Sequence, residues 1–304
     1  MSIVLGPNQY GKAENRVVRI YRDTDRHVIR DLNVSTSLRG NFTAAHVDGD
    51  QSAVLPTDTQ KNTAFAFAKE HGVTSPEDYA LTLAAHFLDA ATAATGARVE
   101  VEEYAWDRIP VGGKGHDHAF VRRGGDTRTT VVTVEGTGTD QRAWVVSGLK
   151  DLVVLKSTGS EFKGYPRDRY TTLPEADDRI LATSLVARWR YAGADAPGGD
   201  WTETFDDVRR ILLETFATTY SRALQESLYA MGSAVLQAHP EIAEFKFSAP
   251  NKHHFLVDLS PFGVENKGEV FVAADRPYGL IEATVTRDDG PEAGDAWLTV
   301  PGFC

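Results

Sequence analysis

The sequence predicts an α+β fold, in which an antiparallel sheet carries helices on one face. Segments that alternate apolar and polar residues, as half-buried strands do, come in pairs. Between these pairs lie regions with the apolar spacing of amphipathic helices. The order strand–strand, helix–helix, strand–strand can be followed twice along the 304 residues. A sheet built from hairpins is antiparallel, and its open edges need cover, which oligomerisation can supply.

The first half, residues 1–138, is expected to open with a hairpin and to continue with two helices. Thr57 and Gln60 stand at the spacing of a capping box, and Asp58 falls in the first helical turn, where the dipole favours a carboxylate. The expected elements are strands over 16–23 and 27–38, a loop over 41–53, helices over 57–70 and from Pro76 to near Gly96, and strands over 98–106, 119–121 and 129–134.

The second half, residues 139–304, follows the same order without a residue-level repeat of fixed period. The boundary between the halves is predicted near 136–141. The expected elements are strands over 144–155 and 179–191, a glycine-rich loop over 192–200, a helical region over 202–237 that breaks near 218–221, a strand after Pro250, and strands over 270–273 and 280–285.

The composition is that of a globular protein, with 41% hydrophobic and 25% charged residues. A net charge of −11 argues against a surface built mainly for nucleic acid. Cys304 is the single cysteine, which excludes an internal disulfide and a thiolate metal cluster, so a reducing cytoplasm is expected. The start of the chain lacks a signal-peptide pattern, and no apolar run approaches the ~18 residues of a membrane span.

Several familiar motifs are incomplete. Residues 136–141 resemble G-x-G-x-x-G without the last glycine, and residues 112–115 lack the spacing of a P-loop. His116 and His118, with Asp117 between them, could share an ion if they lie in a strand, but a third convincing ligand is missing. We expect an exposed hairpin flank there and no metal site.

Two helix starts and one lysine are candidates for chemistry. At Thr57, the first-turn N–H groups and the dipole form an anion site, although Thr57 also fits a simple cap. If a helix restarts at Ser221, Leu224 has a spare amide beside the Gln225 side chain; an ordinary helix face fits equally. Lys12 can act as a base near pH 7 only if its pKa falls by ~3 units from ~10.4, at a cost of roughly 4 kcal/mol, which requires burial or a cationic neighbour.

A strand after Pro250 offers a third kind of candidate. Asn251 and His253 stand two residues apart, so they share one face with Phe255, whereas His254 faces the other side. An amide and an imidazole on one face can bind a small polar molecule, and an ordinary strand with surface histidines fits the same pattern.

Six segments together resemble the urate oxidase family, and the resemblance spans nearly the whole chain. They are Tyr10-Gly11-Lys12, Thr57-Asp58 with Lys61-Asn62-Thr63, Leu155-Lys156-Ser157-Thr158 with Phe162, Arg167-Asp168 with Tyr170-Thr171-Thr172-Leu173, Asp178-Arg179-Ile180-Leu181, and Pro250-Asn251-Lys252-His253. The resemblance implies two tandem tunnelling-fold (T-fold) units, over 1–138 and 139–304. It also implies that their sheets assemble into a barrel-like tunnel, in a homotetramer with active sites between subunits.

The resemblance further implies a reaction and a role for each matching residue. Urate would be oxidised by O2 and water to 5-hydroxyisourate and hydrogen peroxide, without metal or other cofactor. The implied proton relay consists of Lys12, Thr57 and His253. The implied substrate-binding groups are the backbone amides near Thr57 and Asp58, the ring of Phe162, the side chains of Arg179 and Gln225, the amide of Leu224, and Asn251 at the O2 or water site. Some relatives carry valine where Leu224 stands, which matters little for a backbone contact.

The chain ends without the S-K-L of peroxisomal relatives, which implies a bacterial-type cytoplasm. Two other readings are open: an enzyme of the same fold that acts on pterins or other purines, and an oligomer that binds purines without catalysis. The single cysteine weighs against the zinc-using cyclohydrolases of that fold, because they need cysteine ligands.

Overall fold

The computed structural model describes residues 3–195 and 200–298. The chain divides into two compact units. The first takes in the chain up to Gly148, the segment Arg190–Thr202 and the chain from Pro291; the second takes in Leu149–Trp189 and Glu203–Gly290. Each unit combines antiparallel strands with a pair of long helices, so the predicted α+β class is confirmed. The predicted halves, 1–138 and 139–304, divide the chain by pattern and stay a prediction.

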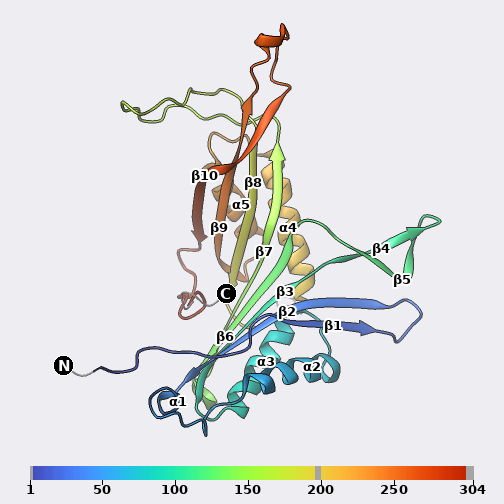
Figure 1. The fold of residues 1–304 in the computed structure, drawn as a ribbon, viewed down its shortest axis with the longest axis vertical. Coiled ribbons are helices and arrows are strands. Elements are labelled where there is room, and N and C mark those ends of the chain that lie inside the picture. Colours follow the sequence, from blue (N-terminus) through green and yellow to red (C-terminus); the bar gives the residue numbers. More distant parts are fainter. Residues whose placement is uncertain (1–2, 196–199, 299–304) are drawn as a thin grey trace. The chain divides into compact units, whose positions relative to one another are not determined.

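In the first unit the strands follow the order β1-β2-β3-β6-β7, and α3 packs on β3 and β6 (Figure 1). Helix α2 packs on α3 and β1. The elements are β1 (Asn15–Tyr21), β2 (Val28–Gly40), α1 (Thr43–Val47), α2 (Thr57–Glu70), α3 (Pro76–Ala90), β3 (Ala94–Glu103), β4 (Trp106–Val111), β5 (Lys114–Arg122), β6 (Thr127–Glu135), η1 (Gly138–Asp140) and the start of β7 (Arg142–Lys156).

Local sequence accounts for the helix pair of this unit. The Ser75 side chain caps α3 by accepting a hydrogen bond from the Asp78 amide at 3.0 Å, and Pro76 occupies the first helical position. Leu83 and Phe87 are fully buried, and they form the apolar face of α3. The sequence predicted that this helix would end near Gly96. Helix α3 instead ends at Ala90, because strand β3 begins at Ala94.

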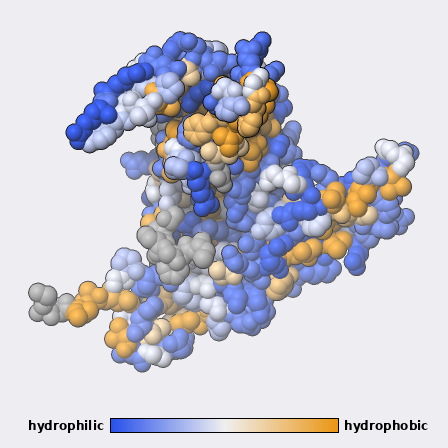
Figure 2. All heavy atoms as spheres, turned by 45° about the horizontal axis from the view of Figure 1, so that its top comes forward, coloured by the Kyte–Doolittle hydropathy of each residue, from blue (hydrophilic) through white to orange (hydrophobic). Residues whose placement is uncertain are grey.

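The region 106–122 also differs from the prediction. It forms the separate two-stranded sheet β4-β5, whereas β6 pairs with β3, with Val99 opposite Val132. The strands predicted over 119–121 and 129–134 therefore belong to different sheets. Figure 2 shows apolar side chains along this projecting hairpin, in which Val111 and Val121 are exposed. The short helix α1 lies inside the expected loop over 41–53.

In the second unit the strands follow the order β7-β8-β9-β10, and α5 packs on β9 and β10 (Figure 1). The core includes Trp189, whose ring stacks on Phe245 at 5.4 Å and on Phe205 at 5.9 Å. The elements are the end of β7, β8 (Leu181–Tyr191), α4 (Trp201–Thr218), α5 (Leu224–Ala238), β9 (Ile242–Leu256), η3 (Ser260–Phe262) and β10 (Phe271–Thr286). The predicted helix break near 218–221 is confirmed.

Two strands of this unit are longer than the sequence predicted. Strand β9 begins at Ile242, and Pro250 lies within it, opposite Leu280. The strands expected at 270–273 and 280–285 are one strand, β10, whose register with β9 shifts between Ala274 and Gly279. A bulge bends a strand without ending it, so the two predicted strands are parts of one.

Candidate functional site

Lys12 is held beside β2 by backbone pairing. The Tyr10 amide donates to the Leu38 carbonyl at 3.1 Å, and the Thr36 amide donates to the Lys12 carbonyl at 2.8 Å. Between them, Gly11 approaches β2 so closely that a Cβ atom would lie 1.7 Å from the Thr36 carbonyl oxygen. Only glycine fits this approach, which explains the Tyr-Gly-Lys order and fixes where the Lys12 side chain leaves the backbone.

Thr36 connects Lys12 to helix α2. Its hydroxyl accepts a hydrogen bond from the Lys12 amide at 3.3 Å and donates to the Gln60 side-chain oxygen at 2.7 Å. The fully buried Gln60 also donates from Nε2 to the Leu55 carbonyl at 3.4 Å. The predicted capping box is therefore wrong, because Thr36, distant in sequence, engages the Gln60 side chain and Pro56 stands at the N-cap.

The start of α2 presents Thr57 and Asp58, as predicted. The first helical hydrogen bond runs from the Gln60 amide to the Pro56 carbonyl at 3.1 Å, so the amides of Thr57 and Asp58 precede it and are available to an anion. Hydrogen bonding from Lys61 and its charge, with a smaller contribution from the charge of Lys12, lower the pKa of the Asp58 carboxyl. Lys12 therefore lies within electrostatic range of the start of α2.

Phe162 and Arg179 meet in the second unit. Phe162 pairs with Ala176 through two backbone hydrogen bonds of 2.9 and 3.0 Å, and its ring stacks on Tyr165 with a centroid distance of 4.9 Å. The guanidinium carbon of Arg179 lies 5.0 Å from the Phe162 ring centroid. The Arg179 amide donates to the Ser160 carbonyl at 2.7 Å. This bond holds the backbone of Arg179 beside the segment that leads to Phe162.

The Arg179 guanidinium is half-buried, and burial lowers its pKa, although an arginine stays protonated near neutral pH. Its Nε is buried without a hydrogen-bond partner among the described residues. Buried N–H groups nearly always have a partner, so this donor indicates a place for an acceptor outside the chain. A flat anion lying near the Phe162 ring would supply one.

The start of α5 is tied to the same segment. The Ser221 amide donates to the Gly159 carbonyl at 3.0 Å, and the Glu161 amide donates to the Ser221 carbonyl at 2.8 Å. Helix α5 begins at Leu224 rather than at Ser221, and Ala223 is its N-cap.

The first turn of α5 leaves two amides available. The Glu226 carboxylate accepts from the Arg222 amide at 2.8 Å, and the Glu226 and Ser227 amides donate to the Ala223 carbonyl. The amides of Leu224 and Gln225 precede these bonds. Because the Leu224 side chain is buried, the residue can meet a ligand only through its backbone, whereas the Gln225 side chain is exposed.

Asn251 and His253 lie on β9. The His253 and Phe255 rings stack at 5.8 Å, so these two residues share one face, as the strand period predicted. His254 instead contacts the Lys252 carbonyl through Nδ1 at 3.1 Å. Among the described residues, no hydrogen bond joins Asn251 or His253 to the group around Phe162.

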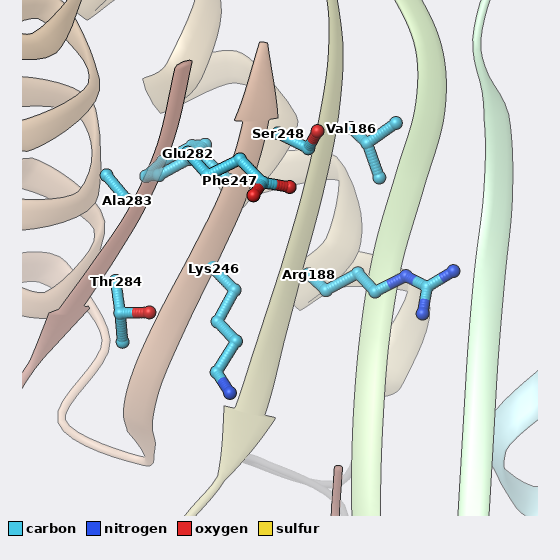
Figure 3. Close-up of a pocket in the computed structure, with 8 residues that line it drawn as sticks. All are labelled: Val186, Arg188, Lys246, Phe247, Ser248, Glu282, Ala283 and Thr284. Carbon is cyan, nitrogen blue, oxygen red and sulfur yellow. The ribbon is translucent and has the colours of Figure 1, made fainter. Parts of the chain in front are cut away.

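Sequence reasoning did not identify the hollow on the sheet face of β8, β9 and β10. Its volume is about 450 Å³, and none of the predicted site residues lines it. Figure 3 shows the side chains of Arg188, Lys246 and Glu282 on this face, with the Glu282 carboxylate reaching across β9. In the sequence, Lys246 and Ser248 alternate with buried phenylalanines, and this alternation could have predicted the polar face. Its charges of both signs give it no clear preference for an anion.

The candidate metal residues lie in β5, where the His116 and His118 rings are 4.5 Å apart and Asp117 pairs with Arg26 at 2.8 Å. Within residues 3–195 and 200–298, no group of three His, Cys, Asp or Glu side chains could hold a metal ion. None of the helices in that part of the chain is long and apolar enough to cross a membrane.

Known proteins resemble this chain over nearly its full length. A family model described as uricase matches residues 8–133 and 145–282. The uricase of Arthrobacter globiformis is 51% identical over 302 residues, covering 99% of this chain and 96% of that protein, and the uricase of Schizosaccharomyces pombe is 38% identical, covering 91% and 96%. The crystal structure of the Arthrobacter uricase superposes with a TM-score of 0.91 over 98% of this chain and 99% of the other. A uricase structure from Bacillus fastidious, 27% identical, gives 0.81 over 92% and 93%.

Proposed function

Because the chain belongs to the uricase family, it is an oxidoreductase that acts on urate, and we propose how its residues divide the reaction. Urate, O2 and water give 5-hydroxyisourate and hydrogen peroxide. Two electrons pass from the purine to O2, which takes up two protons, and the oxygen of water is added to the ring. Fully deprotonated urate is electron-rich enough to reduce O2, so the proposal needs neither a metal nor another cofactor.

The second unit supplies the grip on urate. The Phe162 ring stacks on the purine, and the planar Arg179 fork and the Gln225 amide match the N–H and C=O groups along its pyrimidine edge. The Leu224 amide meets another ring atom, and the amides near Thr57 and Asp58, which belong to the first unit, bind the remaining polar ring atoms. The observation that carries this assignment is that the Arg179 Nε is buried without a hydrogen-bond partner among the described residues, while the guanidinium carbon lies 5.0 Å from the Phe162 ring centroid.

Proton transfer falls to Lys12, Thr57 and His253. The Thr57 hydroxyl passes a proton between urate and Lys12, and His253 is the third member of the relay. Asn251 holds O2 or water above the ring. The support for this group is the position of Lys12 within electrostatic range of the start of α2 and the common face of His253 and Phe255 on β9, which the two-residue strand period extends to Asn251.

We place these sites between subunits of a homotetramer in which the T-fold units of the chains, over 1–138 and 139–304, form a tunnel. Family membership and the open edges of strands β1 and β10 support this arrangement. The bacterial relative supports a cytoplasmic location.

The test is to mix chelator-treated protein with urate in air, to follow the loss of urate absorbance, and to assay hydrogen peroxide. We expect one peroxide formed for each urate consumed, with no dependence on added metal. Turnover only after metal is added would contradict the cofactor-free reaction. Urate binding without peroxide would instead favour the purine-binding oligomer.

A further inference from the structure

Lys156, at the end of β7, makes a contact that the proposed reaction does not use. Its ammonium group donates to the Thr219 carbonyl at 2.5 Å and to the Phe216 carbonyl at 3.5 Å, and it lies 5.3 Å from the Phe216 ring centroid. These carbonyls belong to the last turn of α4 and the residue just beyond it, where a helix leaves acceptors unpaired and the dipole favours a cation. Lys156 therefore caps α4 from another element.

The residues that follow Lys156, up to Glu161, contact the connection between α4 and α5 at two further points. Gly159 and Glu161 bond the backbone of Ser221, and the Tyr220 hydroxyl donates to the Glu161 carboxylate at 2.8 Å. Residues 156–161 thus hold residues 216–221 along their length. This stretch leads directly to Phe162, and the connection leads directly to Leu224.

We propose that Lys156 is a positioning residue for urate, which sets the first turn of α5 relative to the Phe162 ring. Without the Lys156 cap, the last turn of α4 can fray, and the connection to Leu224 loses one of its anchors. The Leu224 amide and the Gln225 side chain would then meet a ring-stacked urate less well. This inference rests on the proposed roles of Phe162, Leu224 and Gln225.

The test compares Lys156→Met with Lys156→Arg in the full-length oligomer, using steady-state oxidation of urate and equilibrium binding of urate without O2. Met keeps the apolar stem and loses the donors, whereas Arg keeps a charged donor of similar reach. We expect Lys156→Met to raise KM and the anaerobic Kd for urate about three- to tenfold, with kcat changed less than twofold. Lys156→Arg should restore most of the affinity.

A purely structural role would lower the folded fraction and the apparent kcat, and would leave KM and Kd unchanged. That result, or an equal loss of affinity in Lys156→Arg, overturns the proposal. Lys267→Met is the matched control, because Lys267 is an exposed lysine whose ion pair within the described part of the chain is with Glu265, at 3.3 Å. If Lys156→Met does not fold, Lys156→Gln, which keeps N–H donors on a shorter side chain, takes its place.

Failure of the proposed function would look different. If the unaltered protein does not oxidise urate, or if Arg179→Ala binds urate as well as the unaltered protein, the assigned site is wrong. If the unaltered protein oxidises urate and Arg179→Ala binds urate more weakly, but Lys156→Met does not change the affinity, only the inference about Lys156 fails.

Discussion

The surroundings of Lys12 and those of Arg179 differ in which buried polar groups the chain leaves without partners. Beside Lys12, the Thr36 hydroxyl and the Gln60 amide bond each other and Asp58 is paired with Lys61, whereas the neutral Tyr10 hydroxyl is buried without a partner among the described residues. Beside Arg179, its own Nε and the Ser160 hydroxyl are buried without partners among the described residues.

This difference separates two ways of building a site. An unpartnered buried donor costs free energy that a ligand acceptor can recover, so the Arg179 region is suited to binding. The Lys12 region instead fixes positions and charges through its internal bonds, which suits proton transfer, where geometry matters most. Substitutions in the Arg179 region should therefore change the affinity for urate, and substitutions in the Lys12 region should change the turnover rate.

The largest expected effect is that of Lys12→Met, which removes the proposed proton acceptor. General acid–base catalysis typically contributes about 10²–10⁴-fold, so we expect kcat to fall by that order with KM changed little. Thr57→Ala should act in the same direction. Steady-state loss of urate absorbance measures both constants.

Thr57→Ser is the matched control for this group, because it keeps the hydroxyl and should retain most of the turnover. A Lys12→Met enzyme with full kcat would remove Lys12 from the relay. A rise in KM without a fall in kcat would make the Lys12 region a binding region and dissolve the contrast with Arg179.

Arg179→Ala should have the next largest effect, on affinity. Hydrogen bonds to a charged group contribute about 1.5–3 kcal/mol, so losing the guanidinium should weaken urate binding by roughly ten- to 150-fold. Anaerobic titration with urate gives the dissociation constant directly. Arg179→Lys keeps the charge without the planar fork, so its affinity for urate should lie between those of Arg179→Ala and the unaltered protein. An affinity equal to that of the unaltered protein would show that charge alone suffices.

The sequence predicted the local parts of both regions and missed their long-range parts. The start of α2 at Thr57 follows from Pro56 beside it, and the helix break at 218–221 follows from the β-branched and capping residues there. The partner of Gln60 could not be predicted, because Thr36 reaches it from β2 and displaces the capping bond. Likewise, nothing near Lys156 in the sequence indicates that its ammonium meets the end of α4, 60 residues away.

The strand carrying Asn251 shows a third limit. The two-residue period correctly placed His253 and Phe255 on one face, because alternation depends only on local geometry. The beginning of β9 was misjudged because Pro250 was taken as a boundary, whereas pairing with β10 carries the strand through it. For the catalytic assignments themselves, family resemblance supplied what spacing left open.

Leu224→Pro should have a smaller effect and isolates one backbone amide. Leu224 is the first residue of α5, where proline is tolerated, and Ala223 before it is extended, as a residue before proline must be. The substitution removes the N–H proposed to meet urate. We expect a KM about tenfold above that of Leu224→Ala, which loses similar packing but keeps the amide. Equal KM values in the two variants would exclude the amide from the site.

The smallest effect is expected at Tyr79, which braces the helix pair of the first unit. Its hydroxyl donates to the Ala64 carbonyl at 2.6 Å, and the side chain is 2% exposed. Tyr79→Phe should cost about 1 kcal/mol and lower Tm by about 2 °C, while leaving the urate KM unchanged, since the contact involves none of the residues proposed to bind urate.

The pH dependence sharpens this last prediction. Burial raises the pKa of Tyr79 above its ordinary value near 10. The folded state therefore keeps the proton that the unfolded state loses, and the stability contributed by Tyr79 is complete below about pH 10 and is lost as the pH rises further. Thermal unfolding of both proteins between pH 8 and 11 should show the Tm difference shrinking above about pH 10. A constant difference would mean that Tyr79 ionises alike in both states, and a raised KM in Tyr79→Phe would mean that the packing of α2 on α3 also sets affinity.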